Sequence, residues 1–369
     1  MTTHAPELDL LPTEIGTDLR DTLRALLAAR CTPSAVAAIY DGDRTIVEPL
    51  WQALASELGV AGLLVPEDRG GVGATAREAA VVLHELGRAC APVPFLTSAV
   101  LATQVLLASK DSAAVDAIGA LAAGELTAAL VVPFSSSPDG ALPHIVDGTD
   151  GLVGTVRSVA GALEADLLVV PVAGAEGIAL HLVERAGAEV VPVSSLDMAR
   201  QVADVTFAGA RSIVVLNDAE TVVRNALRDA AGLLASEQAG VAAWCLQETV
   251  AYLKVRHQFG RPLGGFQAIK HRLADLYAEV SSAAAAAEYA AAALAAGQDV
   301  DVATRVAATY CGDVAVRAAE ETVQLHGGIG MTWEHWAHLY IKKAKADQIG
   351  LGTPGAHRVA LAGLLDLEL

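Results

Sequence analysis

The sequence is poor in aromatic residues and in cysteine, and both shortages exclude classes of protein. Phenylalanine, tryptophan and tyrosine make up only 4% of the 369 residues, so we expect the helices to pack closely through small side chains. The cysteines lie too far apart for a C-x-x-C metal site or a disulfide scaffold. We therefore expect buried free thiols at Cys31, Cys90, Cys245 and Cys311.

Positive charge and long apolar runs are also scarce. Lysine and arginine number 25 against 43 aspartates and glutamates, which gives a formal net charge of −18. Such a surface repels phosphate backbones, so nucleic acid is excluded as the main partner. No apolar run reaches the roughly 18 residues of a membrane span, and the first ten residues, MTTHAPELDL, lack the features of a secretory signal. The sequence thus predicts a soluble, cytoplasmic protein without a membrane span.

Three stretches differ in pattern and predict a helical, then β, then helical organisation. Residues 1–126 show apolar residues at helical spacing, interrupted by proline and glycine. Residues 127–217 hold short β-rich runs separated by Gly, Pro, Asp and Ser, which predicts a domain of antiparallel strands. Residues 218–369 return to long helical patterns. They include an alanine tract over 283–296 that we expect to be a buried helix, rather than a linker, ending at Gly297.

The sequence lacks the common cofactor and catalytic motifs. No G-x-G-x-x-G follows a strand, and there is no Walker loop, H-E-x-x-H or G-x-S-x-G. The ten histidines do not show the spacing of metal ligands, and His326, His335 and His338 lie around tryptophans, as packing or surface residues would. The sequence therefore predicts no metal site.

Two local patterns are candidate binding sites. Residues 255–277, VRHQFGRPLGGFQAIKHRLADLY, group cations before a helix start, where free N–H groups favour an anion. The alternative there is a charged helix–loop–helix corner. Residues 324–340, QLHGGIGMTWEHWAHLY, contain glycines that leave backbone amides uncovered for a ligand. The alternative there is an ordinary turn between helices.

Together these two stretches resemble the acyl-CoA dehydrogenase family. The resemblance extends to VPEDRGGVG and LHELGRACAPVPF near the N-terminus and to LDMAR and VADVTFAGA before the third part, so it covers almost the whole chain. It implies an α+β fold with an N-terminal helical domain, a middle β-domain and a C-terminal four-helix bundle that mediates a dimer or tetramer. It also implies that FAD lies between the middle and C-terminal domains and is completed by a neighbouring subunit.

The family motifs imply which residues bind FAD. Arg256 matches the arginine of the R-x-x-F-G motif, which contacts the pyrophosphate in the family. A guanidinium suits this role because it can donate two parallel, charge-assisted hydrogen bonds to phosphate oxygens. In the middle domain, the segment that usually lines the flavin reads VVPFSSSPDG here, and the usual Trp-x-Thr segment lacks its tryptophan. The other matched cofactor-binding positions are Gln258, Phe259, Gln267, Gln324, Gly327, Gly328, Gly352 and Thr353.

The family's reaction, α,β-dehydrogenation of an acyl-CoA thioester, needs a carboxylate that removes the α-proton while hydride passes to the flavin. At the usual base position this chain has Leu351, which cannot accept a proton, and a second family location falls on Ala230. Glu237 lies seven residues after Ala230 on the same helix face, among apolar neighbours that predict a raised pKa. We predict Glu237 as the catalytic base. The alternative is a structural Glu237 paired with a cation, and the base would then be Asp347 or a carboxylate of a partner subunit.

Two main functions follow from the resemblance. The first is an active FAD-dependent acyl-CoA dehydrogenase that takes an acyl-CoA substrate in lipid or steroid catabolism and passes electrons to an electron-transferring flavoprotein. The second is a catalytically incomplete partner subunit of an α2β2 assembly, which helps to complete the FAD site of an active homologue. Paired, diverged subunits of this kind act on steroid side-chain thioesters in actinobacteria. A flavin-binding relative with other oxidative chemistry is a third possibility.

Overall fold

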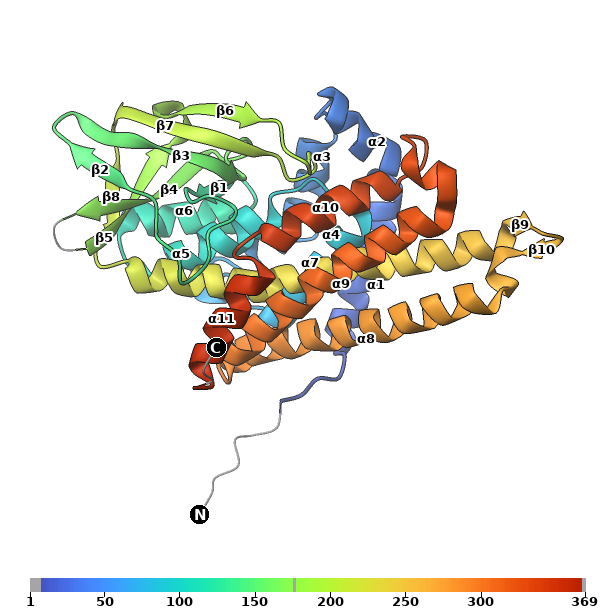
Figure 1. Ribbon diagram of the computed structural model, residues 1–369. Coiled ribbons are helices and arrows are strands. Elements are labelled where there is room, and N and C mark those ends of the chain that lie inside the picture. The colour runs from blue at the N-terminus through green and yellow to red at the C-terminus, as the bar shows by residue number, and fades with distance from the viewer. Residues whose placement is uncertain (1–7, 175–176, 367–369) are drawn as a thin grey trace, which may run out of the picture.

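Helices come first and last in the fold and a β-sheet lies between them, which confirms the predicted fold class (Figure 1). The computed structural model describes residues 8–174 and 177–366. A buried π-helical segment over Phe95–Ala102 leads the first part toward the sheet. The helices of this part are α1 (Glu14–Arg30), α2 (Pro33–Ala38), α3 (Val47–Gln52), α4 (Ala76–Ala89), α5 (Thr103–Leu107) and α6 (Ser112–Ala122).

The sheet needs one correction to the prediction of antiparallel strands. Its order is β6-β7-β3-β2-β4-β5-β8, and both β1 and β2 pair with β4 in parallel, while the other neighbours are antiparallel. Strand β1 pairs with residues 167–169 of β4 and β2 pairs with residues 172–173, so the two parallel strands lie end to end along one edge of β4. The strands are β1 (Ala128–Leu130), β2 (Ile145–Gly148), β3 (Gly151–Ala160), β4 (Leu167–Gly174), β5 (Gly177–Glu184), β6 (Glu189–Val193), β7 (Val202–Ala210) and β8 (Ile213–Leu216).

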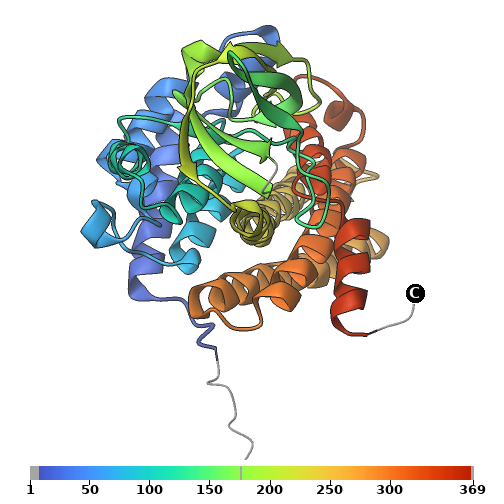
Figure 2. The ribbon, with the colours of Figure 1, turned by 90° about the vertical axis from the view of Figure 1, so that its left-hand side faces the viewer.

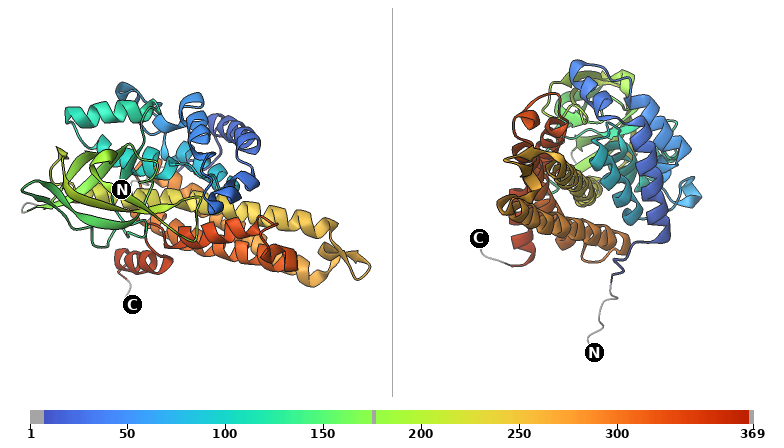
Figure 3. Two further views of the ribbon diagram at one scale, coloured as in Figure 1. Left: turned by 90° about the horizontal axis from the view of Figure 1, so that it is seen from above. Right: turned by 90° about the vertical axis from the view of Figure 1, so that its right-hand side faces the viewer.

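Long helices make up the last part of the chain. The alanine tract is helical and buried along one face, and its helix ends at Gly297 in the left-handed conformation (φ 64°), as predicted. A small hairpin separates the first two long helices and forms the far tip of the molecule (Figure 3). The elements are α7 (Glu220–Val255), β9 (His257–Gln258), β10 (Arg261–Pro262), α8 (Gln267–Ala296), α9 (Val300–His326), α10 (Ala337–Ile349) and α11 (Pro354–Leu364).

Helix α7 lies at the centre, between the first helices, the sheet and the last helices (Figure 2). It approaches α4 so closely that both helices need glycine at the crossing. A Cβ at Gly240 would lie 2.0 Å from the carbonyl oxygen of His84, and a Cβ at Gly87 would lie 2.1 Å from that of Glu237. This crossing fixes the middle of α7, where Glu237 is located.

No helix within residues 8–174 and 177–366 combines the length and apolar character needed to cross a bilayer. The strands of the main sheet begin at residue 128 and end at residue 216. The domain boundaries after residues 126 and 217 stay predictions.

Candidate functional site

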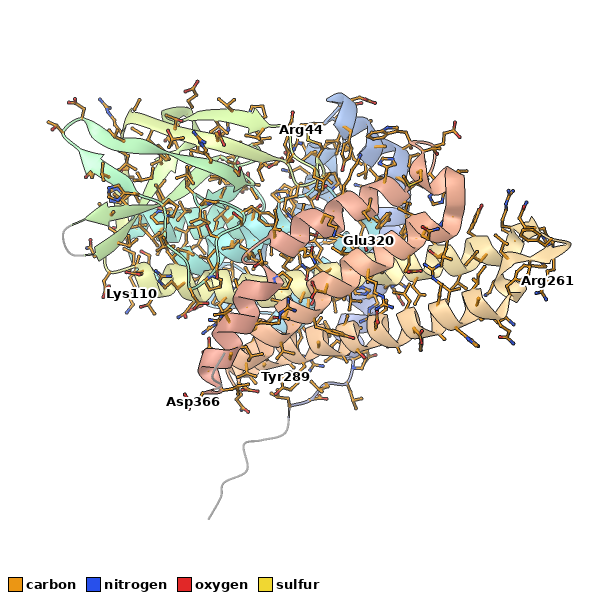
Figure 4. The ribbon with its side chains drawn as sticks, in the orientation of Figure 1. Arg44, Lys110, Arg261, Tyr289, Glu320 and Asp366 are labelled. Atoms are coloured by element: carbon orange, nitrogen blue, oxygen red, sulfur yellow. The ribbon has the colours of Figure 1, made fainter. Side chains whose placement is uncertain are left out.

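The residues of the R-x-x-F-G motif lie on the β9–β10 hairpin and at the start of α8. Arg256 ends α7, and its backbone carbonyl accepts a 2.8 Å hydrogen bond from the N–H of Leu263, which folds the hairpin back. Gln258 and Gln267 are exposed, and Phe259 is 88% exposed. Figure 4 places the neighbouring Arg261 at this tip. The hairpin therefore carries the motif away from the rest of its own chain.

The second motif lies at the end of α9, close to the base of the hairpin. Tyr252 of α7 stacks on the ring of His326 with their centroids 4.3 Å apart, which joins the ends of the two helices. Gln324, Gly327 and Gly328 are exposed. Gly327 has φ of 66° and ψ of −142°, a conformation that favours glycine, and a Cβ at Gly327 or Gly328 would meet nothing within 4 Å. The structure thus brings these three residues to the same end of the molecule as Arg256.

The last Gly-Thr lies in a different place, beside the sheet. The N–H of Leu351 donates a 2.7 Å hydrogen bond to the carbonyl oxygen of Phe134. Gly352 has φ of 105°, and a Cβ there would lie 3.4 Å from the Cα of Ser137. The hydroxyl of Thr353 caps α11. One chain therefore contains two separated groups of cofactor-motif residues, at the hairpin end and beside the sheet.

The region around Leu351 is closed. Its cavity measures about 10 Å³, enough for roughly one water molecule, whereas pockets for cofactors usually exceed about 300 Å³. The ring of Phe134 packs on Gly350 so tightly that a Cβ there would lie 2.5 Å from it. These residues do not fit a flavin ring. The cavity is lined by Thr97, Leu101, Leu130, Val132, Phe134, Ala160 and Leu351.

A buried cluster of charges lies next to this region and includes Glu237. The Nζ atom of Lys343 lies 2.5 Å from Oε1 of Glu237, and Nη2 of Arg200 lies 2.5 Å from Oε2. Arg200 also contacts Asp347 and lies 5.3 Å from the ring centroid of Phe134. We name this group the charge cluster: Asp197, Arg200, Glu237, Lys343 and Asp347.

The charge cluster corrects the predicted pKa of Glu237. Burial alone raises that pKa, as the sequence predicted, but Arg200 and Lys343 outweigh burial and lower it. Asp347 behaves in the opposite way, because burial raises its pKa to about 6 against the effect of the same two cations. Both oxygens of Glu237 thus hold cations, and its role as a base stays a prediction.

No strong pattern in the sequence pointed to the two cations of the cluster, Arg200 and Lys343. Arg200 stands in the LDMAR stretch, 37 residues before Glu237, so no local pattern links them. Lys343 offered a weak signal, since it lies four residues before Asp347 on one helix face.

Comparison with known proteins identifies the chain. The family model for the C-terminal domain of acyl-CoA dehydrogenases matches residues 220–363, and that for the N-terminal domain matches residues 13–125. The acyl-CoA dehydrogenase IpdE2 of Mycobacterium tuberculosis is 37% identical over 94% of this chain and 95% of that protein. IpdE2 of Mycolicibacterium smegmatis is 34% identical over 91% of this chain and 94% of that protein.

Solved structures agree in fold. The ChsE4-ChsE5 complex from Mycobacterium tuberculosis superposes with a TM-score of 0.85 at 26% identity, covering 98% of this chain and 100% of the other. The Tcur3481-Tcur3483 steroid ACAD G363A variant gives 0.83 at 28% identity, covering 96% and 98%. The fold and motifs define a flavoprotein oxidoreductase of the type that acts on CoA thioesters. The chain belongs to the acyl-CoA dehydrogenase family, whose members are FAD-dependent.

Proposed function

We propose that this chain is a subunit of a heteromeric acyl-CoA dehydrogenase, in which a homologous partner supplies the catalytic base and the pocket for the flavin ring. In this assembly the chain binds the diphosphate and adenosine half of the partner's FAD. The substrate is a steroid-derived acyl-CoA thioester, and the electrons pass to an electron-transferring flavoprotein. When bound, FAD supplies the hydride acceptor for the α,β-dehydrogenation.

The closed region beside the sheet carries this proposal. A cavity of about 10 Å³ has no room for a flavin ring or a thioester, and Leu351 stands where the family's base would be. Glu237, the carboxylate predicted to replace that base, is held by Lys343 and Arg200. Proton abstraction needs a carboxylate oxygen within reach of the substrate. The geometry therefore favours a catalytically incomplete partner subunit over a chain that is active by itself.

The hairpin end is exposed, unlike the region around Leu351, and its residues fit the polar half of FAD. Arg256 makes no side-chain hydrogen bond or ion pair with residues 8–174 and 177–366, so its guanidinium is available for a diphosphate. The amides around Gly327 and Gly328 are uncovered. Because the hairpin projects from the tip and the exposed glycines lie near its base, we infer that both groups serve a neighbouring subunit.

Two relatives support a heteromer of this kind. The ChsE4-ChsE5 structure is a complex of two differently named chains, and the Tcur3481-Tcur3483 protein is a steroid ACAD. A longer relative, the acyl-CoA dehydrogenase FadE34 of Mycobacterium tuberculosis, is 37% identical over 87% of this chain but only 44% of its own length. More than half of FadE34 therefore lies outside the matched stretch. That remaining part is long enough to hold a second unit of the same size.

The test compares the chain purified alone with the chain co-expressed with a homologous partner. We expect the chain alone to lack flavin absorbance, and the complex to contain one FAD for each pair of chains. Light scattering gives the mass of the assembly, and released flavin gives the cofactor content. A chain that alone holds one FAD and oxidises an acyl-CoA thioester would overturn the proposal and establish the active dehydrogenase.

A further inference from the structure

Three potential metal ligands meet near the end of α7, although one of them lies 78 residues before the other two begin. They are Glu248 of α7, His326 at the end of α9, and His335 in the turn before α10. One ligand atom from each lies within 4.8 Å of the others. The cluster lies outside the charge cluster, and the proposed function uses none of its side chains.

His326 is prepared to act as a ligand. Its Nδ1 lies 2.7 Å from the carbonyl oxygen of Thr322, and because a carbonyl only accepts, this nitrogen carries the proton. The Nε2 atom then has a lone pair. It is buried without a hydrogen-bond partner among the described residues, and the residue is 3% exposed. A histidine that ligates a metal usually donates its other ring N–H to a carbonyl or carboxylate in this way.

His335 and Glu248 can complete such a site. The ring centroids of His326 and His335 lie 4.2 Å apart, so the two imidazoles face the same small volume. The N–H of Ala337 donates to Nδ1 of His335 at 3.2 Å, which is at the long end of hydrogen-bond distances. Ligation through either ring nitrogen gives up this bond, because Nδ1 then either binds the ion or carries the proton. Glu248 is half-buried and brings a negative charge.

We propose that Glu248, His326 and His335 bind a divalent transition-metal ion of the Zn²⁺ class. Two imidazole nitrogens and one carboxylate oxygen form a common zinc ligand set, and a water molecule would complete a tetrahedron. Bonds of roughly 2.0–2.1 Å place tetrahedral ligand atoms about 3.4 Å apart, so atoms that now lie within 4.8 Å of one another approach by at most about 1.4 Å on binding. Glu248 and His335, being half-buried, have the freedom to make this movement.

The bound ion would connect three segments at the hairpin end. It ties the last turns of α7 to the end of α9 and to the turn before α10. Gly327 and Gly328 lie in the segment between these last two ligands. The sequence predicted no metal because the ligands are 78 and nine residues apart, separations that match no common ligand motif.

The experiment uses the full chain after dialysis against a chelator. Calorimetric titration with ZnCl₂ should show one ion per chain, and CoCl₂ should give the visible absorption of a tetrahedral cobalt site. Glu248→Gln and His335→Ala should each weaken Zn²⁺ binding at least about tenfold. His338→Ala is the matched control: it removes a histidine three residues from His335 that lies outside the cluster, and it should leave binding unchanged.

The proposal is overturned if no stoichiometric Zn²⁺ binding occurs, or if both ligand variants bind Zn²⁺ as the wild type does. Circular dichroism of each variant checks its fold, and Glu248→Gln keeps the size of the side chain if His335→Ala disturbs it. These readouts do not involve flavin. A failure here is therefore distinct from a failure of the proposed function.

Discussion

The ammonium group of Lys343 lies 2.5 Å from Oε1 of Glu237, and this contact joins α10 to the centre of α7. Both side chains are 1% exposed. Buried charges are tolerated only when they are well paired, because removal from water costs several kcal/mol per ion. Three carboxylates share two cations in the charge cluster, so loss of either cation leaves a strong imbalance.

Replacement of Lys343 by methionine should therefore destabilise the protein strongly. We expect Lys343→Met to lower the free energy of unfolding by about 3–5 kcal/mol, since breaking a buried pair leaves an uncompensated charge. Urea unfolding measures the change. Lys345→Met is the matched control, because Lys345 pairs with Glu320 at the surface, where a pair is worth at most about 1 kcal/mol. Equal effects of the two variants would contradict the role of the cluster.

Glu237→Gln separates a structural role from a catalytic one. The pairing with Lys343 and Arg200 predicts that turnover of the assembled enzyme changes less than about tenfold, while the urea midpoint falls. A general base typically contributes about 10²–10⁴-fold to the rate. A loss of that size at unchanged stability would therefore restore Glu237 as the base.

Sequence reasoning predicted what depends on local patterns. The alanine tract and Gly297 define α8 because helix propensity and a left-handed end act within a few residues. The two family motifs could be recognised because each is a short loop at a helix end, and their role in binding FAD stays a prediction. Arg200 could not be assigned to Glu237 and Asp347 in the same way, since only the folding of the whole chain brings them together. The pKa of Glu237 was mispredicted for this reason.

The raised pKa of Asp347 predicts a pH dependence of stability. A carboxyl group with a pKa of 3.8 when unfolded and about 6 when folded binds its proton more tightly in the folded state. Its contribution to stability is fully present below about pH 3.8 and is lost as the pH rises through about 6. We expect the free energy of unfolding of the wild type to fall more between roughly pH 5 and pH 7 than that of Asp347→Asn does. Urea midpoints that change with pH by the same amount in both proteins would refute this prediction.

Leu351→Ala tests whether the closed region takes part in the reaction. Leu351 is 1% exposed, so truncation should lower the free energy of unfolding by about 2–5 kcal/mol. Turnover per FAD of the assembly should stay unchanged, because the proposal places no chemistry beside Leu351. Steady-state assays normalised to flavin content measure this. A large change in turnover per FAD would show that the region contacts substrate or cofactor.

Arg256→Ala tests the hairpin end. The guanidinium of Arg256 is exposed in the single chain, and in the proposed assembly it is buried against a diphosphate. Removal of one partner from such a pair costs about 2–4 kcal/mol, which corresponds to roughly 30- to 1,000-fold weaker FAD binding. Gel filtration of the assembly followed by measurement of released flavin gives the retention. Lys254→Ala removes an exposed cation two residues earlier and should retain FAD. Equal FAD retention in Arg256→Ala and wild type would mean that this arginine does not hold the cofactor, and the anion site predicted at the hairpin would be a charged corner between two helices.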